Sequence, residues 1–222
     1  MGSWDCRAEA PGAAHGYRAS PRGGARRYGL GMARTPTHPP RPEEHPVLLT
    51  KRLRLRRLQM DDVDAMHKCY GDAEAMRYWN RPAHARRDET DRAVRRAMVF
   101  APWKRMVWAV ARDPGDRCIG MVNYHNADMD NRRAEIGYII QPSQQGKGFA
   151  LEAVSAVISF CFAEMGMHRL QAVVDPDNVA SRALLGKLGF REEGVLRESL
   201  LMDGVWRDDV IHGLLVGEWK GK

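Results

Sequence analysis

Leucines alternate with basic residues between positions 49 and 58, and this is the first regular pattern along the chain. Such alternation is typical of a strand with one buried face. Asp61 and Asp62 follow. They are expected to cap a short helix, because acidic side chains accept hydrogen bonds from the free N–H groups at a helix start. A second helix is predicted near residues 88–99, opened by Asp88.

Strands and one long helix are expected in the middle of the chain. Residues 106–125 are predicted to form two strands joined by a Pro-Gly turn, and residues 132–142 form a third that stops at Pro142. Residues 149–166 carry apolar side chains at three- and four-residue spacing. This spacing predicts a helix, with Gly166 as its C-terminal stop.

The last third of the chain predicts a strand over residues 168–175 and a short helix over residues 181–190 that ends at Gly189. A hairpin is expected over residues 195–215, turning at Asp203-Gly204. Strands precede, separate and follow the helices. The pattern therefore predicts an α/β (α+β) fold with a mixed sheet flanked by helices.

The first 46 residues differ from the rest, because they are rich in Gly, Pro, Ala and Arg and show no helical or strand period. Residues 1–46 are expected to be a disordered leader, and residues 47–222 one folded domain. Met32 is an alternative start site. An organelle transit peptide is disfavoured by Asp5 and Glu9.

Composition narrows the class of protein. Hydrophobic residues make up 44% of the chain, yet no apolar run approaches the roughly 18–20 residues of a membrane-spanning helix. No membrane partner and a cytoplasmic location are expected. The four cysteines form no CxxC pair and the histidines no HExxH motif, so no metal site is expected.

The formal net charge of +7 raises the question of nucleic-acid binding. Residues 1–46 hold seven arginines and four acidic residues, while the remainder carries nearly balanced charge. A mixed-charge surface of this kind, without a nucleic-acid-binding motif, predicts no nucleic-acid partner.

The sharpest local motif is the turn Gln145-Gly146-Lys147-Gly148-Phe149-Ala150, between a predicted strand and a predicted helix. Its two glycines allow backbone N–H groups to approach a ligand, and the helix start adds free N–H groups and partial positive charge. The turn lacks the GxxxxGK[ST] pattern of a P-loop and the third glycine of a Rossmann turn. By itself it is either a pyrophosphate cradle or a purely structural turn.

Three blocks of sequence, which follow one another in this order, favour the pyrophosphate cradle over a purely structural turn: residues 134–154, 168–199 and 203–215. With them the chain, from about Leu49 to Trp219, resembles the GNAT superfamily, specifically its RimJ/RimL-type branch of protein N-terminal acetyltransferases. The resemblance implies a GNAT fold, in which a mixed central sheet is flanked by helices and splayed central strands bind CoA.

The resemblance also implies a set of acetyl-CoA contacts. Ile139 and Ile140 would meet the pantetheine arm, and the turn from Gln145 to Ala150 would hold the pyrophosphate through main-chain amides. Lys147 either adds charge there or faces solvent. Asn178 either hydrogen-bonds the pantetheine and orders the site or forms an Asx turn.

Glu135 and Ser181 are the candidate catalytic residues. Glu135 would accept the proton of the amine, unless it is a surface residue paired with Arg132 or Arg133. Ser181 occupies the position that the resemblance places near the CoA sulfur, where helix N-capping is the alternative role.

Two positions depart from the family pattern. Leu185 stands where many GNAT enzymes carry a tyrosine that protonates the departing thiolate, so Ser181 or a water would have to serve. His212 stands where relatives often have tyrosine. It either lines an acceptor groove or is a hydrogen-bonded core histidine.

The resulting hypothesis is transfer of the acetyl group of acetyl-CoA to a primary amine, preferably a protein or peptide N-terminus. A polyamine or aminoglycoside acceptor is one alternative, and a non-catalytic CoA-binding protein is another. The chain is expected to act as a monomer or homodimer. A polycationic acceptor would favour an acidic groove, to which five residues could contribute: Glu192, Glu193, Glu198, Asp208 and Asp209.

Overall fold

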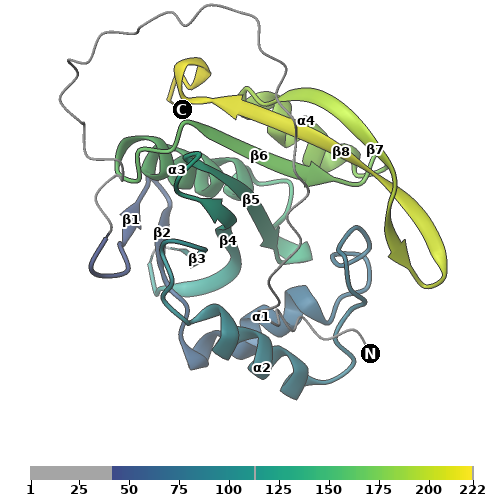
Figure 1. Cartoon of the computed structure of the whole chain (residues 1–222). Helices are drawn as coiled ribbons and strands as arrows, with labels where there is room; N and C mark the ends of the chain where they lie inside the picture. The colour runs from purple at the N-terminus through teal and green to yellow at the C-terminus, as the bar shows by residue number, and fades with distance from the viewer. Residues whose placement is uncertain (1–41, 113, 222) are drawn as a thin grey trace, which may run out of the picture. The chain divides into compact units, whose positions relative to one another are not determined.

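A computed structural model describes residues 42–112 and 114–221. The described chain forms one eight-stranded sheet in the order β1-β2-β3-β4-β5-β6-β8-β7 (Figure 1). The strands are β1 (Leu48–Leu49), β2 (Leu53–Arg57), β3 (Met106–Arg112), β4 (Arg117–Asp128), β5 (Arg133–Ile140), β6 (Arg169–Val174), β7 (Arg191–Met202) and β8 (Val205–Leu215). The helices are α1 (Val63–Tyr70), α2 (Arg87–Ala97), α3 (Phe149–Ala163) and α4 (Val179–Leu188). The predicted mixed sheet with flanking helices is confirmed.

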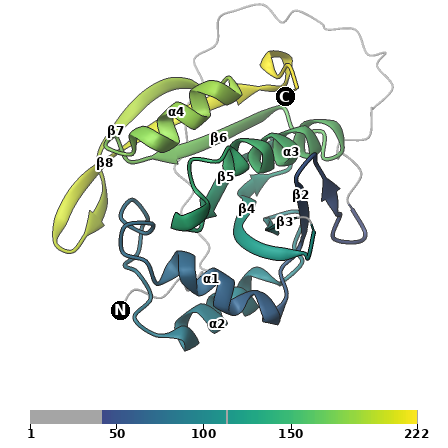
Figure 2. The same cartoon turned by 180° about the vertical axis from the view of Figure 1, so that it is seen from behind.

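The helices cover the two faces of the sheet (Figures 1 and 2). On one face, α1 and α2 pack against apolar residues of β3 and β4, such as Ala109 and Met121. On the other face, α3 and α4 pack against the alternate residues of the same strands, such as Val110 and Val122. Because side chains alternate along a strand, each strand residue can be assigned to the α1/α2 face or the α3/α4 face.

The predicted strand near residues 49–58 divides into β1 and β2, and its alternation has one exception. Arg56 is buried because its guanidinium lies 2.7 Å from Asp62 and 2.6 Å from Asp116. Asp62 precedes α1 as predicted. Its carboxylate binds Arg56 and makes no capping bond to α1, but it accepts a hydrogen bond from Gln59 N at 2.9 Å in the capping box of the 3-10 turn Met60–Asp62, which leads into that helix. The predicted capping role of Asp62 is therefore correct for this turn and wrong for α1 itself.

The start of α2 also differs from the prediction. Arg86 occupies the position before the helix, and Asp88 lies inside the first turn. The Asp88 carboxylate binds Arg86 at 3.0 Å and Arg92 at 2.6 Å. Its charge suits the positive end of the helix, but it does not open the helix.

The predicted turns and helix ends of the C-terminal half are confirmed. Asp203 and Gly204 both have positive φ, 49° and 78°, as a two-residue hairpin turn requires. Gly189 ends α4 with φ of 91°. Gly166 has φ of 62°, and the next amide closes the end of α3 by donating from Met167 N to Cys161 O at 2.9 Å.

Residues 1–41 of the expected leader lie outside the described residues. The last residues of the expected leader, His45 and Pro46, contact β3. His45 Nε2 lies 2.9 Å from Val107 O, and Trp108 Nε1 donates to Pro46 O at 2.9 Å. Ordered structure thus begins before residue 47. Among the described residues, no helix has the length and apolar character needed to cross a bilayer.

Candidate active site

The strands β5 and β6 separate at the centre of the sheet. They pair in parallel only through Arg133–Glu135 and Arg169–Gln171. Beyond these residues β5 stays paired with β4 and β6 with β8. We call the unpaired continuation, residues 136–140 of β5 and 172–174 of β6, the splay. The expected splayed central strands are therefore present.

The backbone of β5 alternates in the direction of its hydrogen-bonding groups. Gln141 N donates to Ile119 O at 2.8 Å, so the groups of Gln141 and Ile139 are directed to β4. Those of Tyr138 and Ile140 then face the splay, and Ile140 O accepts from Gln145 Nε2 at 3.0 Å. This favours Tyr138 and Ile140 over Ile139 as backbone partners for a ligand lying along β5.

The turn before α3 presents free backbone donors. Gly146 and Gly148 have positive φ, 72° and 80°. The first helical hydrogen bond runs from Glu152 N to Gly148 O, which leaves the N–H groups of residues 149–151 without helical acceptors. In the described ranges, the N–H groups of residues 146–148 also have no backbone acceptor. Such a set of donors at a helix N-terminus can bind an anion.

Two arginines flank this turn. The guanidiniums of Arg52 and Arg112 lie 4.7 and 5.1 Å from the centroid of the Phe149 ring. Arg52 also binds Glu152 at 2.7 Å and donates to Lys147 O at 3.0 Å, so it braces the turn. The Lys147 ammonium folds back onto Ser143 O at 2.6 Å. Sequence reasoning considered Lys147 alone, because Arg52, just before β2, and Arg112, in β3, are far from the turn in sequence.

Ser181 and Tyr138 meet across the splay on the α3/α4 face. The Tyr138 hydroxyl of β5 lies 2.6 Å from Ser181 Oγ of α4. Ser181 does not cap the helix; Asn178 does, since its Oδ1 accepts from Ser181 N at 3.1 Å. The alternative capping role of Ser181 is therefore wrong. Burial raises the pKa of Tyr138 to about 12, against the smaller opposite effect of its bond to Ser181, so the phenol stays protonated at neutral pH.

Glu135 lies on the α1/α2 face, where it belongs to a polar network. Its Oε1 lies 3.1 Å from His125 Nε2, and its Oε2 lies 3.5 Å from the amide nitrogens of Asn126 and Gln171. His125 Nδ1 in turn lies 3.0 Å from Asn123 Oδ1. This network is part of the α1/α2 face of β4, β5 and β6.

The alternative pairing of Glu135 with neighbouring arginines is wrong, because Arg133 binds Asp128 at 3.2 Å and Glu135 is directed to His125. Burial raises the pKa of Glu135, but the hydrogen bonds from His125, Gln171 and Asn126 together outweigh it. The pKa therefore lies below the ordinary value. Glu135 is an ionised carboxylate at neutral pH, partly shielded from water.

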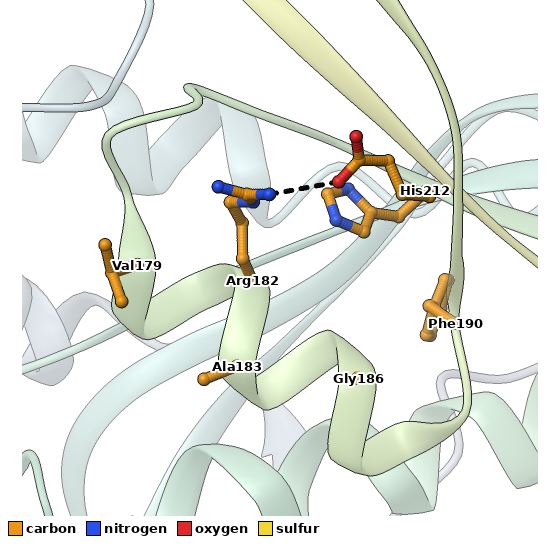
Figure 3. A pocket seen from close by; sticks show the side chains of 7 residues that line it. Val179, Arg182, Ala183, Gly186, Phe190 and His212 are labelled. Carbon is orange, nitrogen blue, oxygen red and sulfur yellow. Dashed lines mark hydrogen bonds and ion pairs between the residues drawn. The ribbon is translucent and has the colours of Figure 1, made fainter.

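Leu185 and His212 are both buried. Leu185 lies on α4, one turn after Ser181, and packs into the hydrophobic core. His212 is buried on the α3/α4 face, with Nδ1 3.3 Å from Val210 O, which agrees with a hydrogen-bonded core histidine. It lines a hollow between α4 and strands β7 and β8 (Figure 3). Arg182 and Glu192 cross this hollow with an ion pair of 3.0 Å.

Four of the five acidic residues on β7 and β8 have carboxylates that make ion pairs or hydrogen bonds. Glu192 binds Arg182, and Glu193 binds Arg169 at 2.5 Å. Asp208 accepts from the Glu198 amide at 2.8 Å, and Asp209 accepts from a serine hydroxyl. The described residues also contain no group of three or more His, Cys, Asp or Glu side chains that could hold a metal ion.

Comparisons with known proteins agree with this geometry. Residues 52–191 match the family described as "Acetyltransferase (GNAT) domain". The chain is 35% identical over 174 residues to the uncharacterized N-acetyltransferase YoaA of Bacillus subtilis, covering 77% of this chain and 97% of that protein. It is 38% identical over 109 residues to the [ribosomal protein uS5]-alanine N-acetyltransferase of Escherichia coli, covering 48% and 56% of the two chains.

Among solved structures, the chain is similar to spermidine N-acetyltransferase from Vibrio cholerae in complex with CoA and spermine. The TM-score is 0.67 at 25% sequence identity, and the similarity covers 76% of this chain and 98% of that one.

Proposed function

The chain belongs to the GNAT family of acetyltransferases, and we propose that it acetylates the N-terminal amine of a protein or peptide. It is an acetyl-CoA-dependent N-acetyltransferase, as its family and its relatives show. The peptide acceptor and the roles of individual residues are the proposal. The observation that carries it is the position of Glu135 at the last β5–β6 pair, where the splay begins, and of the Tyr138–Ser181 pair across the splay on the opposite face of the sheet.

The described residues fit acetyl-CoA. The free N–H groups of residues 146–151 suit a pyrophosphate, with Arg52 and Arg112 close by to add positive charge. The outward backbone groups of Tyr138 and Ile140 suit the amide groups of a pantetheine arm laid along β5. Acetyl-CoA supplies the activated acetyl group as a thioester.

On the α3/α4 face, the hydroxyl pair would stabilise the departing thiolate. A phenol is a stronger acid than an alcohol, so Tyr138 preferentially donates its O–H to Ser181 Oγ. The remaining Ser181 proton is then free to point away from Tyr138, toward the sulfur. In this arrangement Ser181 touches the reacting atoms, and Tyr138 acts by orienting it. Tyr138 thus supplies a phenol next to Ser181, while Leu185 stands on α4 where the family resemblance implies a tyrosine.

On the α1/α2 face, Glu135 would accept the proton from the attacking amine, directly or through one water. His125 holds the carboxylate by hydrogen bonding and keeps it ionised. The amine and the thioester therefore approach the splay from opposite faces. Positioning the two reactants in this way accounts for much of the rate of an uncomplicated acyl transfer.

Ion pairs on β7 reduce the negative charge available to a polycation and so favour a peptide. Glu192 and Glu193 are paired with arginines, while Asp208 and Asp209 keep their charge and are hydrogen-bonded within the hairpin. A polyamine is still the second candidate, because a structural relative at 25% identity is a spermidine N-acetyltransferase. The cytoplasmic location and the monomeric or homodimeric state remain predictions from sequence.

The test is a thiol-release assay with acetyl-CoA and matched acceptors: peptides with free N-termini, the same peptides with blocked N-termini, aminoglycosides and polyamines. Release with free but not blocked peptides supports the proposal. Release with spermidine and none with peptides overturns the peptide acceptor, while leaving the acetyltransferase activity in place. Glu135→Gln and Ser181→Ala then test the two residue roles.

A further inference from the structure

Arg81, in the segment between α1 and α2, has a guanidinium that no carboxylate balances. It lies 4.9 Å from the ring centroid of Tyr70 and 5.6 Å from that of Trp79. Its Nε is fully buried and has no hydrogen-bond partner. A buried donor without a partner is destabilising, so such a group calls for an explanation.

Several other arginines of the described chain have the acidic partner that Arg81 lacks. Arg56 binds Asp62 and Asp116, Arg52 binds Glu152, and even exposed Arg95 binds Asp91 at 2.6 Å. For Arg81, within residues 42–112 and 114–221, there is no ion pair with an acidic side chain. The aromatic rings fix the guanidinium in place without neutralising its charge.

A continuous series of contacts links Arg81 to the proposed base. The Tyr70 hydroxyl beneath Arg81 donates to Met121 Sδ at 3.4 Å, and Asn123 Nδ2 approaches the same sulfur at 3.9 Å. Asn123 contacts His125, which contacts Glu135. All of these strand residues lie on the α1/α2 face. Arg81 therefore lies above the face from which the amine would approach.

Arg81 supplies a positive charge next to His84. The His84 ring packs 5.1 Å from the Tyr70 ring, and its pKa is lowered first by burial and then by the charge of Arg81, against the opposite effect of Glu89. The Arg81 guanidinium itself repels a polyamine and attracts a carboxylate. It can bind a carboxylate through two parallel hydrogen bonds from its terminal nitrogens.

We propose that Arg81 binds a carboxylate of the acceptor and so selects peptides with an acidic residue shortly after the N-terminal one. This inference rests on the proposed function. Met121 is paired with Ile139 of β5, so only one strand spacing, about 4.8 Å, separates it from the edge of the splay. An extended peptide advances about 3.4 Å per residue, so the inference requires a carboxylate a few residues after the amine.

The test uses the full chain and three peptides that differ at the second and third residues: Glu-Glu, Gln-Gln and Lys-Lys after an N-terminal alanine. The wild type is expected to show a kcat/KM about 10-fold higher for the Glu-Glu peptide than for the Gln-Gln peptide, through a lower acceptor KM. Arg81→Gln should abolish this preference, and Arg81→Glu should invert it toward the Lys-Lys peptide. The dissociation constant of acetyl-CoA should not change in either variant.

Arg77→Gln is the matched control, since Arg77 is an exposed neighbour whose guanidinium lies near Glu74 and Tyr78. It should keep the wild-type preference. Arg81→Lys preserves the charge, so it should keep part of the preference even if loss of charge impairs folding. An unchanged Glu-Glu preference in Arg81→Gln, or an equal loss for all three peptides, would overturn the inference. Absence of turnover with every peptide in the wild type would instead overturn the proposed function.

Discussion

The two faces of the sheet meet at the splay, and they are built in different ways. On the α3/α4 face, the anion-binding part is main chain, namely the N–H groups of residues 146–151 in one short turn. On the α1/α2 face, the polar network is made of side chains from β4, β5 and β6, and Arg81 adds a fourth segment. A main-chain site can be recognised locally in a sequence, whereas a side-chain site depends on the sheet register.

The contrast also suggests a division of labour. In the proposed function, the backbone cradle would bind the part of acetyl-CoA that every family member shares, and such a cradle tolerates changes of side chain. A network of side chains can be altered one residue at a time, which suits recognition of different acceptors. Substitutions on the α1/α2 face should therefore change turnover and acceptor choice, and substitutions in the turn should change acetyl-CoA affinity.

The largest effect is expected for Glu135→Gln. Loss of the carboxylate removes the proton acceptor, so kcat should fall about 100- to 1000-fold. Acetyl-CoA binding, measured by calorimetry, should be unchanged because the cradle lies on the opposite face. Glu164→Gln, an exposed acid after α3, is the control. Full kcat in Glu135→Gln would assign proton removal to another group.

The Tyr138–Ser181 pair should give the next largest effect. Ser181→Ala is expected to lower kcat by about 10- to 100-fold, and Tyr138→Phe by somewhat less, without a matching rise in the KM of acetyl-CoA. Because Tyr138 acts through Ser181, the double variant should be no slower than Ser181→Ala.

With acetyl thioesters of more acidic thiols, the fall in kcat caused by either single substitution should be smaller, because the departing thiolates need less stabilisation. Ser143→Ala, at an exposed position before the turn, is the control. Losses that multiply in the double variant would contradict the proposed arrangement.

Gly148→Ala should weaken acetyl-CoA binding about 10-fold, which corresponds to roughly 1.4 kcal/mol. The residue has φ of 80°, and an added Cβ would lie 3.3 Å from Arg52 Nη2, the group that braces the turn. At saturating acetyl-CoA, the turnover rate of the variant should equal that of the wild type. Gly217→Ala is the control, because its Cβ would meet nothing and its φ is ordinary. A fall in kcat with unchanged affinity would place the turn in the chemical step instead.

The smallest effect is on the shape of the pH profile. The pKa of Glu135 is below its ordinary value, so the carboxylate stays ionised from pH 6 to 9 and is protonated only in more acidic solution. With peptides, kcat/KM should rise with pH and level off near the α-amine pKa of about 8. With a lysine-like amine the rise should continue above pH 9. A plateau already reached at pH 6 with peptides would contradict deprotonation of the amine as the controlling step.

Much of the fold could be predicted because its signals are local. The period of α3 and the turn at Asp203-Gly204 depend only on neighbouring residues. Long-range pairings could not be predicted. Asp62 has the side chain of a helix cap, but it also binds the buried Arg56. The reason is that a buried guanidinium requires a counter-charge.

The same limit applies to the site. The turn at residues 145–150 was recognisable, as were the positions of Glu135 and Ser181. Tyr138 was missed because its partner lies 43 residues away on another element. His125 was missed for a similar reason. The register of the predicted strand pair, had it been worked out, would have placed His125 opposite Glu135.

The short pairing of β5 with β6 also bears on how the chain assembles. Strands β1 to β5 each pair with their neighbour in sequence, and β7 and β8 form a hairpin that adds to β6. Both halves can form through local contacts, whereas joining them requires three residues of parallel register after the α3 crossover. We expect this junction to form last in folding and to open first, so that amide hydrogens at its centre exchange faster than those of β3 and β4.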